Sequence, residues 1–236
     1  FTTDVDLHIP AATATRLESG GAAVGVAVDI DTESRNATTP DIGADEFAGT
    51  PAPPNDMAAG VFVSPLNGAN VPTGAAFAPQ ATFVNQGTAA QTNVTVRYKI
   101  IDSSMATVYD QTATIPTIAP LQSVPVTFPN ATLTAPGTYT IQATAELAGD
   151  TNPANDQITG TINGLEPFSG TINVGTGETF TSLTNAGGVF QALNNAGISG
   201  NLTVNITSDL TAETGAVPLN QLAEAGVGRS EERRVG

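Results

Sequence analysis

Alternation of apolar and polar residues with a period of two recurs through the middle of the chain. In NVTVRYKI (93–100), every second residue from Val94 to Ile100 is apolar and the residues between them are polar. YTIQATAEL (139–147) alternates in the same way. Because successive side chains of a β-strand point to opposite faces of the sheet, both stretches are predicted to be half-buried antiparallel strands.

Three shorter stretches continue this pattern: ATFVNQG (81–87), VPVTFP (124–129) and DQITGTI (156–162). Turn sequences such as NQG, APG and GDTNPAND separate them. Roughly seven strands in about 110 residues is the size of a two-sheet sandwich. Pro-rich sequences bound the region on both sides, so a β-sandwich is predicted at residues 52–166.

The residues on either side of the sandwich show a different pattern. In residues 1–49, the short apolar pieces VDLHI and VGVAVDI are separated by Gly, Ala and Thr, which is typical of stacked solenoid coils. In residues 168–228, LTVNI (202–206) alternates like a first coil strand. Four apolar residues before it fall at helical spacing: Leu183, Ala186, Phe190 and Leu193. They predict a short helix that caps the stack, although Gly187 and Gly188 weaken it.

The middle region contains the sequences ATFVNQGTAAQTNVTVRYKI, APGTYTIQATAEL and GDTNPANDQITGTI. On these sequences it resembles the CARDB family, the Ig-like cell-adhesion-related domain of bacterial surface proteins. The resemblance spans nearly the whole of residues 52–166. It implies a spacer or adhesion module without catalytic residues, in a protein that is secreted or displayed on the bacterial cell surface.

The flanking regions carry a second resemblance. The DLHI sequence at 6–9, the DID turn at 29–31 with Arg35 after it, and PDIGADE at 40–46 resemble the closing turns of right-handed parallel β-helix proteins of bacterial surfaces. Thr32 stands where members of that family usually have Gly. The region after the sandwich resembles the N-terminal cap and first coil of such a helix. The expected architecture is therefore all-β: an Ig-like β-sandwich between the C-terminal end of one parallel β-helix and the N-terminal cap and first coil of another.

The last eight residues, RSEERRVG (229–236), differ from the rest of the chain in composition. They hold three of the 7 Lys and Arg residues. The sequence matches the translation of a widely used sequencing adapter, so we interpret it as a non-native tail and exclude it from the fold. The chain also begins with Phe1 instead of Met. We therefore expect a piece of a longer protein, in which other domains of the same chain are partners.

Charge and composition narrow the choice of partners. The formal net charge is −15, with almost no basic residues to form a patch, so nucleic acid and anionic lipid are not expected to bind. Cys is absent, which excludes disulfides and thiolate metal sites. There is no run of about 18 apolar residues, so membrane insertion is not expected. The resemblance to an adhesion domain implies a carbohydrate or a surface protein as the expected ligand.

Two features are candidates for chemistry. The single histidine is His8, and the sequence around it does not supply the residues that a catalytic or metal role would need, so a structural or solvent-facing role is expected. A cluster of six acidic residues lies between positions 29 and 46: Asp29, Asp31, Glu33, Asp41, Asp45 and Glu46. Their oxygens could bind a structural calcium ion, but Ser34 and Pro40 stand where a calcium-binding EF-hand loop has Gly and Glu. Because Asp side chains also bond backbone amides in turns, no catalytic, cofactor-binding or metal residue is assigned.

The expected function is that of a non-catalytic adhesion and spacer module of a large bacterial surface or secreted protein. The alternative is an accessory part of a β-helical polysaccharide lyase or glycoside hydrolase. Against it, no pair of carboxylates can be placed at the separation that glycoside hydrolysis needs. The first region also has only two basic residues, Arg16 and Arg35, to attract an acidic polysaccharide.

Overall fold

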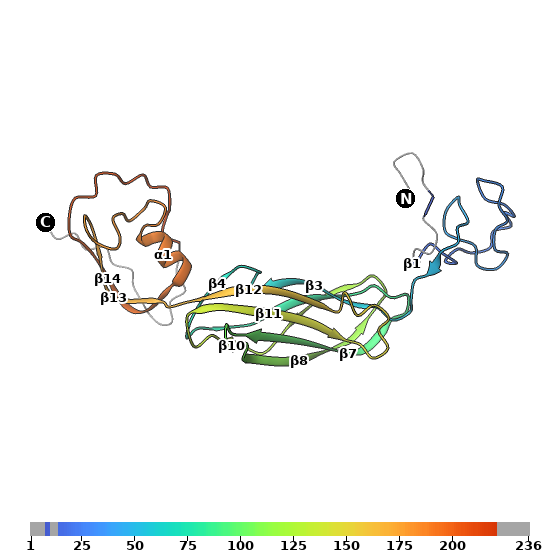
Figure 1. Ribbon diagram of the computed structural model, residues 1–236, viewed down its shortest axis with the longest axis horizontal. Helices are drawn as coiled ribbons and strands as arrows, with labels where there is room; N and C mark the ends of the chain where they lie inside the picture. The colour runs from blue at the N-terminus through green and yellow to red at the C-terminus, as the bar shows by residue number, and fades with distance from the viewer. Residues whose placement is uncertain (1–7, 10–13, 221–236) are drawn as a thin grey trace.

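The described residues form three parts along one long axis (Figure 1). The computed structural model describes residues 8–9 and 14–220. A β-sandwich lies in the middle, and a smaller unit lies at each end. We call the end units the N-terminal unit, which ends at residue 51, and the C-terminal unit, which begins at residue 168.

The larger sheet of the sandwich has five strands. Its order from edge to edge is β4 (Asn70–Pro72), β12 (Gln157–Leu165), β11 (Gly137–Glu146), β7 (Gln91–Ile101) and β8 (Thr107–Ile118). Neighbours are antiparallel, except that β4 runs parallel to β12. The alternating sequences NVTVRYKI and YTIQATAEL therefore fall in β7 and β11, two of the three inner strands, where one face of each strand is buried.

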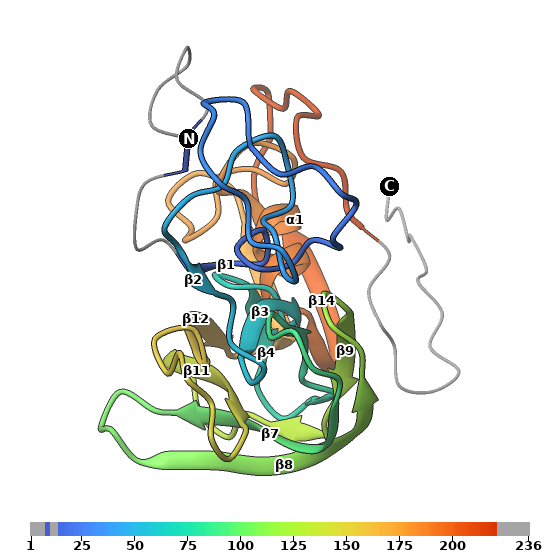
Figure 2. The same ribbon diagram turned by 90° about the vertical axis from the view of Figure 1, so that its right-hand side faces the viewer.

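The second sheet covers one face of the first. It consists of β3 (Met57–Ser64), β6 (Gln80–Asn85) and β9 (Ser123–Thr127), paired antiparallel. β5 (Ala76–Phe77) and β10 (Ala131–Thr132) form a short separate pair. In Figure 2, which looks along the long axis, β7 and β8 form the lower layer and β3 lies above them. The all-β sandwich predicted from the sequence is confirmed.

Residues from both sheets share one core. On β7 the four alternating apolar residues are at most 1% exposed, as the alternation predicts: Val94, Val96, Tyr98 and Ile100. Phe83 on β6 and Ile141 on β11 are fully buried in the same cluster. On the opposite face of the larger sheet, the Arg97 guanidinium binds Asp110 at 2.8 Å and also contacts Glu146. Removal of the apolar side chains from water is the main force that holds the two sheets together.

Two buried tyrosines of this core differ in the pairing of their hydroxyls. The Tyr139 hydroxyl donates to the Ala135 carbonyl oxygen at 2.7 Å, as in the tyrosine corner of other sandwiches. Gly164 leaves room for the ring, because a Cβ there would lie 3.0 Å from it. The Tyr98 hydroxyl is shielded from solvent and has no hydrogen-bond partner among the described residues. Burial raises the pKa of Tyr98 above its usual value.

Replacing each tyrosine by phenylalanine is expected to have opposite effects. Tyr139→Phe removes a hydrogen bond and is expected to lower the free energy of unfolding by about 1 kcal/mol. Tyr98→Phe removes an unpaired buried hydroxyl and is expected to raise it by about 1 kcal/mol. Urea unfolding followed by circular dichroism measures both values. A similar loss of stability in the two variants would contradict the pairing described above.

The described residues of the N-terminal unit include a parallel strand pair. β1 (Ala14–Thr15) pairs with β2 (Thr50–Pro51), so the unit extends to the end of β2, slightly beyond the boundary at residue 49 expected from the sequence. The predictions for Asp6 and Leu7 of the DLHI sequence, and for the tail at 229–236, fall on residues outside those that the structure describes.

The apolar sequence VGVAVDI of this unit, whose composition is typical of stacked coils, contains no β-strand. It contains turns and a single bridge, from Val28 to Ser34. Gly25 has a φ of 81°, a left-handed conformation that breaks an extended segment. Val24 and Ile30 are 80% and 71% exposed, so their side chains are not packed into the unit. Periodicity alone could not reveal this, because it does not show whether a neighbouring strand is present.

The C-terminal unit also has a parallel pair. β13 (Phe168–Val174) pairs with β14 (Ile198–Ile206), and α1 (Val189–Ala196) lies between them in the sequence. The amide of Asn205 donates to the Asn173 side-chain oxygen at 3.3 Å, between residues 32 positions apart. Two passes of the chain are therefore stacked with their strands in register, as in a solenoid.

The helix begins later than the sequence pattern predicted. The expected apolar stripe started at Leu183, but α1 starts at Val189, directly after Gly188. Gly187 has a φ of 80°, and a Cβ at Gly188 would lie 2.8 Å from a backbone carbonyl oxygen. The two glycines thus form the turn into the helix instead of lying within it. Leu193 is still buried, and Leu183 packs against the same cluster.

Glu213 joins the two stacked passes of the C-terminal unit. Its carboxylate accepts hydrogen bonds from the backbone N–H groups of Leu183 at 2.9 Å and Thr184 at 2.7 Å, and from the Thr184 hydroxyl. The Thr184 hydroxyl, with the Ser182 hydroxyl and the two N–H groups, outweighs the effect of burial and lowers the pKa of Glu213 to about 2. The ionised carboxylate is therefore the form that the folded unit binds.

We expect the C-terminal unit to loosen in acid because of Glu213. A carboxyl group whose pKa is lowered by folding contributes its full stabilisation when the pH is above its pKa in the unfolded chain, here 4.5. This stabilisation is lost as the pH falls toward the pKa in the folded chain, about 2. The protection of the amides of residues 168–220, measured as the exchange rate relative to the intrinsic rate of each amide at the same pH, is expected to fall over that range. Glu213→Gln is expected to exchange faster already at pH 7 and to lack this pH dependence, whereas Asp209→Asn, at an exposed position, serves as the control.

Candidate functional site

The acidic stretch of residues 28–47, which we call the closing turn, is built around Asp29. This residue is 8% exposed. Its carboxylate accepts three backbone N–H groups, from Asp31 at 2.9 Å, Glu33 at 2.7 Å and Glu46 at 3.1 Å. Burial alone would raise the pKa of Asp29, but the N–H groups and a nearby arginine lower it. Asp29 therefore stabilises the turn, in the way that Asp residues cap turns in general.

Asp41 and Glu46 have similar roles. Asp41 accepts the backbone N–H groups of Ser19 at 2.6 Å and Phe47 at 2.9 Å. Glu46 accepts two backbone N–H groups, at 2.8 and 3.0 Å, and lies 3.4 Å from the Arg35 guanidinium. These carboxylates hold the backbone of the N-terminal unit, so they are poor candidates for catalysis.

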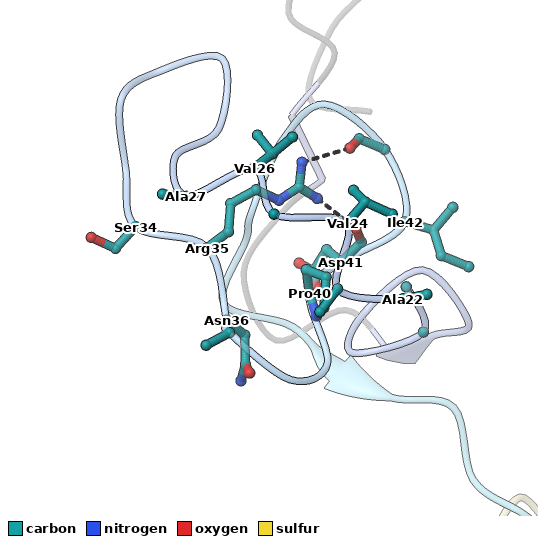
Figure 3. A pocket seen from close by; sticks show the side chains of 16 residues that line it. Ala22, Val24, Val26, Ala27, Ser34, Arg35, Asn36, Pro40, Asp41 and Ile42 are labelled. Atoms are coloured by element: carbon teal, nitrogen blue, oxygen red, sulfur yellow. Dashed lines mark hydrogen bonds between the residues drawn. The ribbon is translucent and has the colours of Figure 1, made fainter.

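A surface hollow of about 970 Å³ lies beside the closing turn. Arg35 reaches along it and donates to the carbonyl oxygens of Asp41 at 2.6 Å and Gly43 at 2.9 Å (Figure 3). The apolar wall includes Val24 and Val26, which are 80% and 58% exposed. The charged side chains that line this hollow, Arg35 and Asp41, are hydrogen-bonded to backbone groups of the N-terminal unit. They are therefore poor candidates for a general acid or base.

A second, smaller hollow of about 370 Å³ contains the remaining candidates. His8, Asp31, Glu33 and Asp45 line it, and His8 Nε2 lies 2.6 Å from Asp31 Oδ2. The sequence around His8 did not supply residues for a catalytic or metal role, but the turn at 29–33 brings Asp31 to it. This approach could not be read from the spacing, because it depends on the loop conformation that Asp29 fixes. Glu33 and Asp31 are exposed, whereas Asp45 is half-buried.

A third group of acidic residues lies at one end of the sandwich. Asp56 is 8% exposed and accepts the Asn155 amide at 2.8 Å, while Asp150 accepts the backbone N–H of Met57 at 2.6 Å. Oδ1 of Asp156 is shielded from solvent and has no hydrogen-bond partner among the described residues. Burial, and then the charges of Asp150 and Asp56, raise the pKa of Asp156.

Asp156→Asn is expected to stabilise the sandwich at neutral pH. A carboxyl group whose pKa is raised by folding destabilises the folded state once it ionises. The free energy of unfolding therefore falls as the pH rises from 3.8, the pKa in the unfolded chain, through the higher pKa in the folded chain. The variant removes this charge and is expected to melt a few degrees higher at pH 7. The difference is expected to disappear below pH 3.8. Thermal unfolding at both pH values tests this, and equal melting temperatures at pH 7 would count against it.

Arg16, one of the two basic residues of the first region, contacts the sandwich. Its guanidinium donates to the carbonyl oxygen of Gln86 at 2.6 Å and also to that of Gly87. At the other end, a Cβ placed on Gly197 would lie 3.6 Å from the Pro72 ring, so the C-terminal unit touches β4. Both end units therefore have a direct contact with the sandwich.

Across residues 8–9 and 14–220, no helix has the length and apolar character needed to cross a membrane.

No known family model and no curated protein matches the chain. The CARDB domain of a Pyrococcus furiosus protein, solved in complex with di-metal ions, is 19% identical, with a TM-score of 0.37, and the match covers 47% of this chain and 88% of that one. A domain of a candidate cell surface protein from Methanosarcina acetivorans is 21% identical, with a TM-score of 0.34. That match covers 49% of this chain and 96% of that one. A family 123 glycoside hydrolase from Clostridium perfringens is 10% identical, with a TM-score of 0.34. That match covers 51% of this chain and 30% of that one. At these identities and TM-scores, none of them gives this chain a ligand or an activity.

Proposed function

We propose that the chain is a spacer and adhesion module of a bacterial protein that is secreted or displayed on the cell surface. In this proposal the sandwich keeps the two end units apart. The exposed faces of the three parts are available to a carbohydrate or a surface-protein ligand, and no catalytic step is assigned to the described residues.

The observation that carries the proposal is the path of the chain through the sandwich. The N-terminal unit leads into β3 at one end of the long axis, and β12 leads into the C-terminal unit at the other end (Figure 1). A domain with its entry and exit at opposite ends adds its full length to the distance between its neighbours. The strand β8, with 12 residues at about 3.4 Å each, indicates a length of about 40 Å.

We further propose that the end units are the last turns of one parallel β-helix and the first coil of another. The parallel pairs β1–β2 and β13–β14 support this, since parallel strands separated by a long excursion are the repeating feature of such solenoids. The contacts of Arg16 and Pro72 with the neighbouring parts support a spacer with defined joints.

A distance measurement between the end units tests the spacer proposal. The chain has no Cys, so Ala37→Cys and Ala186→Cys, both at exposed positions, can carry a donor and an acceptor dye. We expect single-molecule energy transfer to report one narrow distance population above about 40 Å. Arg16→Ala is expected to broaden it. Deleting residues 52–166 is expected to shorten it.

A broad distribution or a short distance in the intact chain would show that the sandwich does not separate the end units.

A further inference from the structure

The smaller hollow beside the closing turn brings together three side chains that can bind metals. One imidazole nitrogen of His8 and one carboxylate oxygen each of Asp31 and Asp45 all lie within 4.8 Å of one another. We propose that these residues form a site for a divalent transition metal ion of the Zn²⁺ type. This site is independent of the spacer function.

The distances suit such an ion. Zn²⁺ binds nitrogen and carboxylate ligands at about 2.0–2.2 Å, which places two tetrahedral ligands about 3.4 Å apart. His8 Nε2 and Asp31 Oδ2 are 2.6 Å apart, so they share a hydrogen bond in the metal-free form. A small opening of this contact would admit the ion, which then replaces the shared proton. His8 and Asp31 are both about half exposed, so their side chains have room for that movement.

The second, independent observation is the state of Asp45. Its Oδ2 atom is shielded from solvent and has no hydrogen-bond partner among the described residues. An ionised oxygen removed from water without a partner costs free energy. Asp29, Asp41 and Glu46 of the same turn, by contrast, bind backbone N–H groups. A cation in the hollow would supply the partner that Asp45 lacks.

The surrounding charge also favours a cation. Four carboxylates line the hollow: those of Asp31, Glu33, Asp45 and Glu46. Arg35, which contacts Glu46 of this lining, is also bonded to backbone oxygens. An imidazole together with carboxylates is a ligand set for Zn²⁺ and related transition metals, whereas Ca²⁺ takes 6–8 oxygen ligands. Water would complete the coordination. The ion would join the segment that carries His8 to both ends of the closing turn.

Calorimetric titration with zinc chloride tests the site on the complete chain without a purification tag. His8 is the single histidine and there is no Cys, so no competing imidazole or thiolate is present. We expect one zinc ion to bind. His8→Ala and Asp45→Asn are each expected to weaken the affinity about tenfold or more, and Asp31→Asn gives an isosteric third variant. Asp209→Asn, an exposed charge in the C-terminal unit, is expected to leave the affinity unchanged.

Each other outcome would overturn the proposal. Equal zinc affinity in His8→Ala and in the unaltered chain would mean an adventitious surface ion only. No heat of binding at about 100 µM zinc, or binding of calcium chloride in preference to zinc chloride, would exclude this ligand set. Circular dichroism of each variant shows whether the sandwich is intact, so a loss of affinity can be separated from a loss of folding.

Discussion

Phe83→Ala is expected to lower the free energy of unfolding of the sandwich by about 3–5 kcal/mol. Phe83 is fully buried on β6, in the cluster that both sheets share. Its truncation removes a buried apolar side chain from the core. It also leaves a cavity, because β6 is held in place by its pairing with β3 and β9. Since domains of this size are stable by about 5–15 kcal/mol, the loss is a large part of the total. Urea unfolding followed by far-ultraviolet circular dichroism measures it.

Val61→Ala provides the matched control on the neighbouring strand. Val61 lies on β3 and is 61% exposed, so its truncation is expected to change stability by less than about 0.5 kcal/mol. If the Phe83 and Val61 variants lost similar stability, the assignment of the core between the two sheets would be wrong.

Asp29→Ala is expected to open the N-terminal unit and leave the sandwich unchanged. The substitution removes the acceptor of three backbone N–H groups, two from the start of the closing turn and one from its end. Within the part of the chain that the structure describes, these N–H groups have no other hydrogen-bond acceptor, so the turn loses the contact that joins its two ends. Limited proteolysis with mass spectrometry is expected to show cleavage within residues 28–47 about tenfold faster or more.

In the unaltered chain, low pH is expected to accelerate cleavage of the closing turn as Asp29→Ala does. Because the pKa of Asp29 is lowered, its stabilisation is complete above the ordinary value of 3.8 and is lost as the pH falls through the lower folded value. Glu33→Gln changes a neighbouring exposed carboxylate and is expected to leave the cleavage rate unchanged. Rapid cleavage of the Glu33 variant, or slow cleavage of Asp29→Ala, would show that Asp29 does not hold the turn.

The inner strands of the sandwich could be predicted because their burial has a simple period. One face of β7 is buried and the other carries Arg97 and Lys99, so the alternation in the sequence reflects the sheet directly. β8 carries a weaker signal. It is an edge strand in which only Ile115 and Ile118 are fully buried, so its sequence shows no strict alternation.

The end units were harder to predict because their structure depends on contacts between distant passes of the chain. Asn173 meets Asn205, and Thr184 meets Glu213, across about 30 residues that follow no fixed local pattern. The glycines before α1 also moved the start of the helix, since the apolar spacing does not specify backbone conformation. The assignment of both units to parallel β-helices, the cell-surface location and the origin of the tail stay predictions.

The candidate site was predicted only in part. The sequence indicated that Asp side chains would cap the closing turn, and Asp29 and Asp41 do so. It did not indicate that Asp45 would have an unpaired oxygen near His8, because that depends on how residue 8 approaches the turn. Pairings of this kind arise from tertiary structure and leave no spacing signal.

Amide hydrogen exchange over the whole chain tests most directly whether the sandwich folds around its own core, separately from the end units. We expect the amides of β7 and β11 to exchange slowest, and Asp29→Ala and Glu213→Gln each to accelerate exchange only within its own end unit. If either substitution accelerated exchange in β7 and β11 to the same extent, the three parts would form one cooperative unit and the proposed division of the chain would be wrong.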